Sequence, residues 1–300
     1  MNYLITGGTG LVGKALVEVL YKSGANITVL TRNVDKAAES LNLPITFLKK
    51  LSLADIENND IIINLAGESI ADKRWSATQK EKICHSRWDI TQQLASLILV
   101  ADKPPSIFIS GSAIGLYGRQ NTQAITEDFT QHHPEFTHTV CSRWESIALS
   151  AQSNKTRVAL LRTGIVLAPN GGALAKMLPP FKLGLGGKIG DGKQMMSWIH
   201  IKDMVSAIIH IQNTPSLTGA INLTAEHAVN NAVFSHTLAK VLRRPSLLTT
   251  PAMMIKLLFG EMSDLLLFGQ NVVPNKLTES GFLFKYNELP LALADIVKKR

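Results

Sequence analysis

The stretch YLITGGTGLVG, residues Tyr3 to Gly13, decides the fold of this 300-residue chain. Its apolar start predicts a short strand, and its glycines predict a tight turn into a helix. Gly7 permits the turn, Gly10 lets a ligand approach the backbone, and Gly13 lets the helix pack on its strand. We expect the amino end of that helix, at Ala15 to Leu20, to present unpaired N–H groups and a positive dipole. The stretch therefore predicts a loop that holds a pyrophosphate.

The residues around this loop complete a β-α-β unit. Apolar side chains recur through the predicted helix, and Gly24 can end it. A second apolar strand follows at Ile27 to Leu30. This is the context in which a glycine-rich turn predicts a dinucleotide site, and a turn of purely structural use is the alternative.

The residues after the second strand bear on the choice of dinucleotide. A site for NAD usually has an Asp or Glu there, which binds the ribose 2′-hydroxyl. This chain has Thr31-Arg32-Asn33 instead. A guanidinium binds a 2′-phosphate through charge-assisted hydrogen bonds, whereas a carboxylate repels it. The sequence therefore favours NADP, with a solvated loop arginine as the alternative reading of Arg32.

Composition describes an ordinary globular protein, with 45% hydrophobic and 18% charged residues. The formal net charge is +8, but the basic residues are scattered, without the long stripe typical of nucleic-acid binding. Cys84 and Cys141 have no metal-ligand spacing, so no metal site is expected. Charges interrupt the apolar stretch from Met253 to Phe268, and the first strand begins at once, so we expect neither a membrane span nor a signal peptide. These observations predict a cytoplasmic protein with a small-molecule substrate and with no nucleic-acid or membrane partner. They set no oligomeric state.

Strands and helices alternate through the first half of the chain, which predicts a doubly wound parallel α/β sheet of Rossmann type. Further strands are expected at 61–65, 107–110, 158–161 and 220–223, with helices at 76–100, 142–151, 204–212, 230–244 and 251–268. Glycine-rich connections from Pro169 onward predict a smaller carboxy-terminal substrate lobe. We expect a nucleotide-binding domain over 1–168, continued by 196–225, and a lobe made of 169–195 and 226–300.

Other motifs follow the predicted strands. The glycine-rich loop, Asn64 to Gly67, and Ser110 to Ser112 leading to Tyr117-Gly118 together resemble the extended short-chain dehydrogenase/reductase superfamily. A narrower resemblance is to its atypical branch, the SDR39U1-type epimerase family. That resemblance adds the segments Val140–Glu145, Arg162–Leu167, Gly171–Leu174, Leu178–Gly187, Met196–Ile201, Asn222–Pro245 and Gly281-Phe282.

The resemblance implies a set of residues that would bind the cofactor NADP. Thr31 and Arg32 would meet the 2′-phosphate, Leu65 and Ala66 would line the adenosine and ribose side, and Val166 would lie near the nicotinamide. Arg87, on the long helix, would also reach the cofactor. Each of these residues has a simpler reading as core or as solvated surface. The full predicted set is Gly7, Gly10, Leu11, Val12, Gly13, Thr31, Arg32, Leu65, Ala66, Gly67, Arg87 and Val166.

The usual chemistry of the superfamily needs a Tyr and, four residues later, a Lys on one helix face. The lysine lowers the tyrosine pKa, so that the phenol can exchange a proton with a carbonyl or hydroxyl. None of the four tyrosines in this chain has that lysine. If Glu145 is aligned with the acidic residue that often trails the motif, Thr137 and Cys141 occupy the two positions. The proton-relay pair is therefore missing.

Two accounts of the activity follow. In the first, the protein is an oxidoreductase or epimerase acting on a small carbonyl or nucleotide-sugar-like substrate, with Ser112 and Tyr117 as the candidate catalytic residues. Cys141, Trp198, His200 and Asp203 are further candidates. In the second, the protein binds NADP(H) without turnover and acts as a sensor or binding module, because a nucleotide pocket alone does not establish catalysis.

Overall fold

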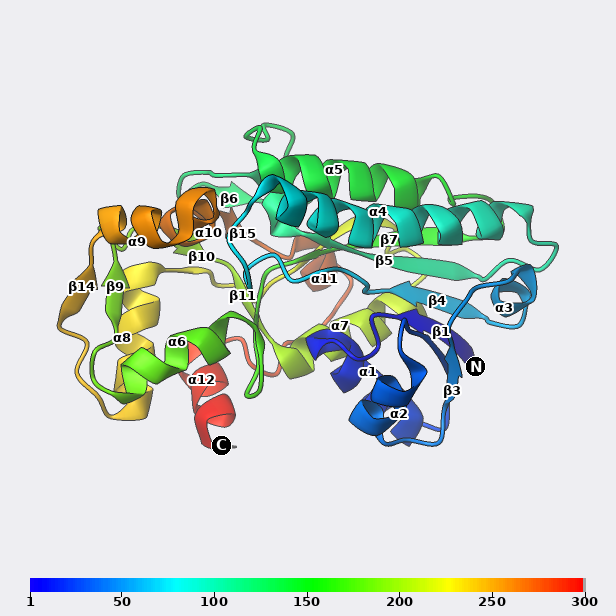
Figure 1. The fold of residues 1–300 in the computed structure, drawn as a ribbon, viewed down its shortest axis with the longest axis horizontal. Coiled ribbons are helices and arrows are strands. Elements are labelled where there is room, and N and C mark those ends of the chain that lie inside the picture. Colours follow the sequence, from blue (N-terminus) through cyan, green and yellow to red (C-terminus); the bar gives the residue numbers. More distant parts are fainter. Residues whose placement is uncertain (299–300) are drawn as a thin grey trace.

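A computed structural model describes residues 1–298 and contains one seven-stranded parallel sheet (Figure 1). The strand order is β12-β7-β5-β4-β1-β2-β3. From β1 the chain adds β2 and β3 on one side and then β4, β5, β7 and β12 on the other side, so the order of the strands reverses between β1 and β4. The predicted doubly wound α/β fold of Rossmann type is confirmed. The strands are β1 (Asn2–Thr6), β2 (Asn26–Leu30), β3 (Thr46–Leu48), β4 (Ile61–Asn64), β5 (Ile107–Ala113), β7 (Arg157–Thr163) and β12 (Gly219–Leu223).

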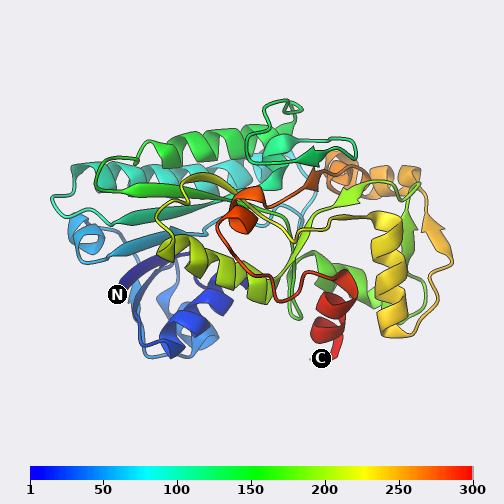
Figure 2. The ribbon, with the colours of Figure 1, turned by 180° about the vertical axis from the view of Figure 1, so that it is seen from behind.

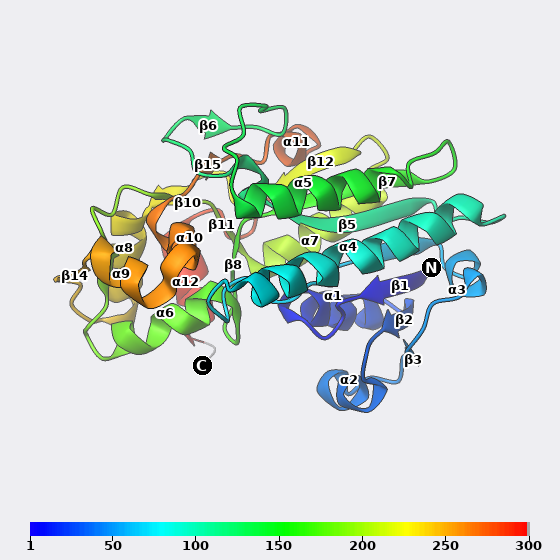
Figure 3. The same cartoon turned by 45° about the horizontal axis from the view of Figure 1, so that its top comes forward.

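Helices cover both faces of this sheet. The long helices α4 and α5 lie side by side on one face, as Figure 3 shows, and α1 and α7 pack together on the other. Successive side chains of the buried strands point to opposite faces of the sheet. Leu4 belongs to the core under α4, whereas Ile5 belongs to the core under α1. The helices are α1 (Leu11–Lys22), α2 (Val34–Leu41), α3 (Leu53–Glu57), α4 (Ala77–Val100), α5 (Phe136–Leu149) and α7 (Ile201–Asn213).

A second hydrophobic core lies beyond the carboxyl ends of the strands. Leu174, Phe234 and Leu293 are buried in it, together with Trp198. Figure 2 shows its helices gathered at the end of the molecule opposite to β1–β3. Its elements are β8 (Ile165–Leu167), α6 (Gly172–Lys182), β9 (Gly187–Ile189), β10 (Met195–Met196), β11 (Trp198–His200), β13 (Val229–Asn230), α8 (Asn231–Leu242), β14 (Leu248–Thr250) and α12 (Leu289–Lys298).

The remaining elements connect the two cores. β6 and β15 pair with each other, and Leu277 of α11 packs in the core of the main sheet. These elements are η1 (Ile114–Tyr117), β6 (Ala124–Ile125), α9 (Ala252–Phe259), η2 (Gly260–Ser263), α10 (Asp264–Leu267), β15 (Asn271–Val272) and α11 (Asn275–Glu279). Within residues 1–298 no helix is long and apolar enough to cross a membrane.

Several helix boundaries differ from the expected ones. α1 begins at Leu11 and not at Ala15, because Gly10 has the extended backbone of an N-cap and the helix starts at once. α5 begins at Phe136, six residues before the expected start. The helix expected over 251–268 is broken, because Gly260 adopts a φ of +59°, which a helix interior does not tolerate.

Candidate functional site

The glycine-rich loop lies where β1 ends. Gly7 has a φ of +69°, and a Cβ added to it would lie 2.5 Å from the backbone carbon of Leu65. A Cβ on Gly13 would lie 2.2 Å from the Gly7 carbonyl oxygen. Only glycine fits at either position, so the first turn of α1 sits directly against the loop.

The amino end of α1 is open to a ligand. Gly10 provides no side-chain cap, and the first turn contains no acidic residue. The N–H groups of Leu11, Val12 and Gly13 therefore have no partner within the helix and carry the positive end of its dipole. The structure brings the predicted glycines, Leu11 and Val12 together in a cradle whose chemistry fits a pyrophosphate.

The end of β2 presents an exposed cation. Arg32 forms no ion pair with any residue that the structure describes. The Thr31 N–H donates to the Leu48 carbonyl at 2.8 Å, so the ends of β2 and β3 lie side by side. Lys49 and Lys50 follow β3 directly and are also exposed. Sequence reasoning passed over these two lysines, although the parallel pairing of β2 with β3 would have placed them beside Arg32.

The end of β4 meets the long helix α4. A Cβ on Gly67 would lie 3.0 Å from Cζ of Arg87, so the guanidinium packs on the chain just after Leu65 and Ala66. Arg87 Nη1 donates to the Ile83 carbonyl at 2.9 Å. Burial lowers the pKa of Arg87, and no carboxylate among residues 1–298 forms an ion pair with it. An unneutralised guanidinium of this kind suits an anionic or oxygen-rich ligand.

Val166 lies close to the amino end of α1. A Cβ on Gly172 would lie 3.2 Å from the Val166 carbonyl oxygen and 3.1 Å from Cδ2 of Leu11. The start of α6 therefore rests on the glycine-rich loop. Apart from Arg87 on α4 and Val166 within β8, the predicted cofactor residues follow the carboxyl ends of β1, β2 and β4, where ligands of such sheets bind.

A network of buried, hydrogen-bonded side chains lies next to Arg87. Asn64 Nδ2 and Trp144 Nε1 both donate to the Thr91 hydroxyl, at 2.8 Å and 2.9 Å, and Cζ of Arg87 lies 5.4 Å from the Trp144 ring. A Cβ on Gly111 would lie 2.7 Å from the same indole, so β5 and α5 are in close contact there. Sequence reasoning missed Thr91 and Trp144, because they lie on different helices and share no local motif.

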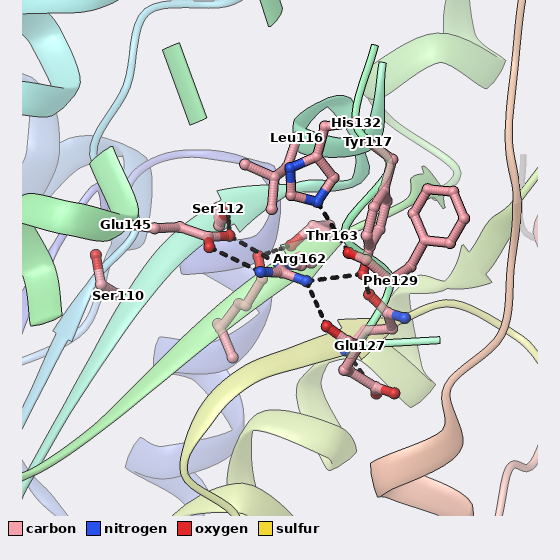
Figure 4. Close-up of polar contacts among 12 residues, drawn as sticks. Ser110, Ser112, Leu116, Tyr117, Glu127, Phe129, His132, Glu145, Arg162 and Thr163 are labelled. Atoms are coloured by element: carbon pink, nitrogen blue, oxygen red, sulfur yellow. Dashed lines mark hydrogen bonds and ion pairs between the residues drawn. The ribbon is translucent and has the colours of Figure 1, made fainter. Parts of the chain in front are cut away.

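Ser112 and Tyr117 belong to a second buried network, drawn in Figure 4. The Ser112 hydroxyl donates to Glu145 Oε1 at 2.6 Å, and Arg162 binds both oxygens of Glu145, at 2.9 Å and 3.0 Å. The Tyr117 hydroxyl donates to Asn222 Oδ1 at 2.7 Å and accepts from Arg162 Nη1 at 2.9 Å. The network ties β5, η1, α5, β7 and β12 together.

This network encloses the predicted catalytic groups. Tyr117 is 0% exposed, and burial raises its pKa. Ser112 is also buried, with its proton engaged by Glu145. The structure thus brings Ser112 and Tyr117 into one cluster, and it turns both hydroxyls toward protein groups.

The surroundings of Cys141 disfavour a reactive thiolate. Burial, together with the nearby Glu145, raises the pKa of its thiol to about 12. Thr137, four residues earlier on α5, is buried, and its hydroxyl donates to Glu135 at 2.8 Å. The positions expected for the proton-relay pair therefore hold two neutral groups.

Trp198, His200 and Asp203 hold the carboxy-terminal segment in place. Asp203 accepts backbone hydrogen bonds from Lys285 and Tyr286, at 3.0 Å and 2.8 Å. The His200 ring stacks on that of Tyr286 with centroids 3.9 Å apart, and Trp198 is buried in the second core. Their interactions in this structure are those of packing and capping, and a part in the chemistry stays a prediction.

Comparisons with known proteins agree with this geometry. Residues 3–223 match the NAD dependent epimerase/dehydratase family, and residues 250–296 match a domain of unknown function, DUF1731. An epimerase family protein of Staphylococcus saprophyticus is 39% identical over 296 residues, which is 99% of both chains. The chain therefore belongs to the NAD dependent epimerase/dehydratase family.

Two solved structures are similar over the whole of this chain. The human epimerase family protein SDR39U1 (isoform 2), solved with NADPH, has a TM-score of 0.90 and 31% identity, with each chain covered completely. The nucleoside-diphosphate sugar epimerase of Corynebacterium glutamicum has a TM-score of 0.78 and 28% identity, with 59% of its own length covered. The resemblance to SDR39U1-type epimerase proteins is confirmed.

Proposed function

We propose that this protein binds NADP(H) and acts as an atypical oxidoreductase or epimerase on a small carbonyl or nucleotide-sugar-like substrate. The observation that carries the proposal is the exposed guanidinium of Arg32 past β2, at the position where an NAD site has a carboxylate. Lys49 and Lys50 add positive charge beside it. The NADPH in the human relative supports the same choice of cofactor.

The remaining residues fit the other parts of the cofactor. The N–H groups of Leu11 to Gly13 bind the pyrophosphate, and Leu65 and Ala66 line the adenosine side. Arg87, whose guanidinium packs on Gly67, would donate to cofactor oxygens, and Val166 would lie beside the nicotinamide ring. When bound, the nicotinamide would supply hydride chemistry, and these residues would orient it. Ser112 and Tyr117 are positioning residues in this proposal, because they hold Glu145 and Arg162.

The test of the cofactor assignment is the affinity of Arg32→Ala for NADPH and for NADH. Loss of a charge-assisted contact weakens NADPH binding by about tenfold or more and leaves NADH binding nearly unchanged. Lys22→Ala, at the far end of α1, is the matched control and leaves both affinities unchanged. Equal losses for the two cofactors in Arg32→Ala would contradict the assignment.

A second candidate function is a non-catalytic NADP(H) sensor. The observation that favours it is the enclosure of Tyr117 and Cys141, because burial raises the pKa of both groups and so opposes proton exchange by either of them at neutral pH. Oxidation of NADPH across a panel of carbonyls and sugar nucleotides separates the two functions. Sustained turnover supports the enzyme, whereas tight NADPH binding with no turnover supports the sensor.

A further inference from the structure

The end of the molecule farthest from β1–β3 is formed by two loops, at the left of Figure 1. One is residues 182–188, from the last residue of α6 into β9, and the other is residues 243–248, from the end of α8 to the first residue of β14. β9 and β14 pair in parallel, and a Cβ on Gly184 would lie 3.5 Å from Pro245. The two loops therefore form one continuous surface, which we call the lobe tip.

The lobe tip exposes large apolar side chains. Leu247 is 90% exposed, Leu183 75%, Leu185 60% and Leu248 51%. A leucine alone on a surface is ordinary, but four on two touching loops gather exposed apolar area at one end of the molecule, as is typical of a contact site.

The same loops are basic. Lys182, Lys188, Arg243 and Arg244 are all exposed, and none forms an ion pair with the residues that the structure describes. The surrounding sequence contains no Asp or Glu over positions 172–190 or 227–260. The lobe tip therefore attracts a surface that is both apolar and negatively charged.

A polar hollow opens beside the exposed leucines. Its volume is about 140 Å³, which has room for several water molecules and hence for a phosphate group. Lys188, His236, Ser246 and Thr249 line it with possible donors. Ser235 also lines it, and the buried hydroxyl of Ser235 has no hydrogen-bond partner among residues 1–298.

We propose that the lobe tip docks on a membrane surface rich in anionic lipids. The leucines enter the boundary between headgroups and acyl chains, the four cations meet the lipid phosphates, and the hollow takes one headgroup. Docking on a membrane surface needs no helix that spans the membrane. The proposal therefore replaces the sequence-based expectation of no membrane partner, and it keeps the expectation of no membrane span. A symmetric dimer through the same tip is disfavoured, because it would bring like charges together.

The test is flotation of the whole protein with vesicles of phosphatidylcholine alone and with vesicles that also contain phosphatidylglycerol. Wild-type protein floats with the anionic vesicles only, and added salt releases it. Arg243→Gln/Arg244→Gln weakens the binding by roughly 25-fold, since each cation near such a surface contributes about fivefold. Leu183→Ser/Leu247→Ser also weakens it.

Matched controls keep the test specific. Lys103→Gln and Leu291→Ser remove an exposed cation and an exposed leucine elsewhere, and they leave vesicle binding unchanged. All variants retain NADPH affinity if they are folded, so failure of the docking proposal is distinct from failure of the cofactor proposal. Equal binding to both vesicle types would overturn the proposal, as would no binding to either. A concentration-dependent dimer that Leu183→Ser/Leu247→Ser abolishes, without vesicle binding, would assign the tip to a second copy of the chain.

Discussion

Replacement of Arg162 by Met is the sharpest test of how the buried network in Figure 4 stabilises the fold. The side chains of Arg162 and Glu145 are 9% and 8% exposed, and two hydrogen bonds join them. Burial opposes the charge of Arg162, but the bonds to Glu145 raise its pKa. Methionine fills similar space and leaves Glu145 as a buried carboxylate with Ser112 as its remaining side-chain donor.

The expected cost is about 3–5 kcal/mol of unfolding free energy, the usual penalty for leaving one partner of a buried ion pair alone. For a chain of this length, that loss lowers Tm by roughly 5–8 °C. The double variant Arg162→Met/Glu145→Leu is less destabilised than Arg162→Met, because it removes the stranded carboxylate as well. Lys176→Met is the control: its ion pair with Asp72 is 51% and 57% exposed, so the loss is within about 1 kcal/mol.

Urea unfolding followed by tryptophan fluorescence measures all four free energies at neutral pH. Arg162→Met within about 1 kcal/mol of wild type would refute the reasoning, since that is the scale of an exposed pair. A double variant less stable than Arg162→Met would refute it too, because Glu145 would then stabilise the fold without its cation.

Three further results are expected. Burial raises the pKa of Glu127 in the folded protein above its ordinary value of 4.5. The contribution of Glu127 to stability is therefore present below pH 4.5 and is lost as the pH rises through the folded pKa. As the pH rises through that pKa, Glu127→Gln gains stability relative to wild type, as measured by urea unfolding. Gly13→Ala forces the loop apart and weakens NADPH binding by about tenfold or more, whereas Gly24→Ala, whose added methyl meets no atom within 4 Å, leaves the affinity unchanged in the same titration. Iodoacetamide does not label Cys141 in the folded protein at neutral pH, because burial and Glu145 raise the pKa of its thiol to about 12, and mass spectrometry finds it labelled only after unfolding.

The sequence predicted those parts of the fold that depend on local patterns. The strand at 3–5 and the glycines after it define β1, the loop and α1, because backbone conformation and close approach there need residues without a Cβ. The buried run at 61–63 is apolar throughout, as expected of a strand covered on both faces.

The parts that the sequence did not reveal depend on contacts between distant segments. The motif makes Tyr117 a candidate catalytic residue, yet its hydroxyl donates to Asn222, which lies 105 residues away. Arg162 on β7 binds Glu145 on α5. Thr91 on α4 accepts hydrogen bonds from one residue on β4 and one on α5. No short pattern carries such pairings, because each partner is an ordinary residue in its own element.

The contact of Leu11 with the start of α6 has a consequence for the whole molecule. Leu11 belongs to the first turn of α1, and the glycines at 171 and 172 leave room for its side chain. Any movement that lifts α6 also frees this side chain and loosens the backbone amides next to it. The second core and the nucleotide cradle therefore meet at this side chain, and we expect a displacement of α6 to reach the loop that holds the pyrophosphate.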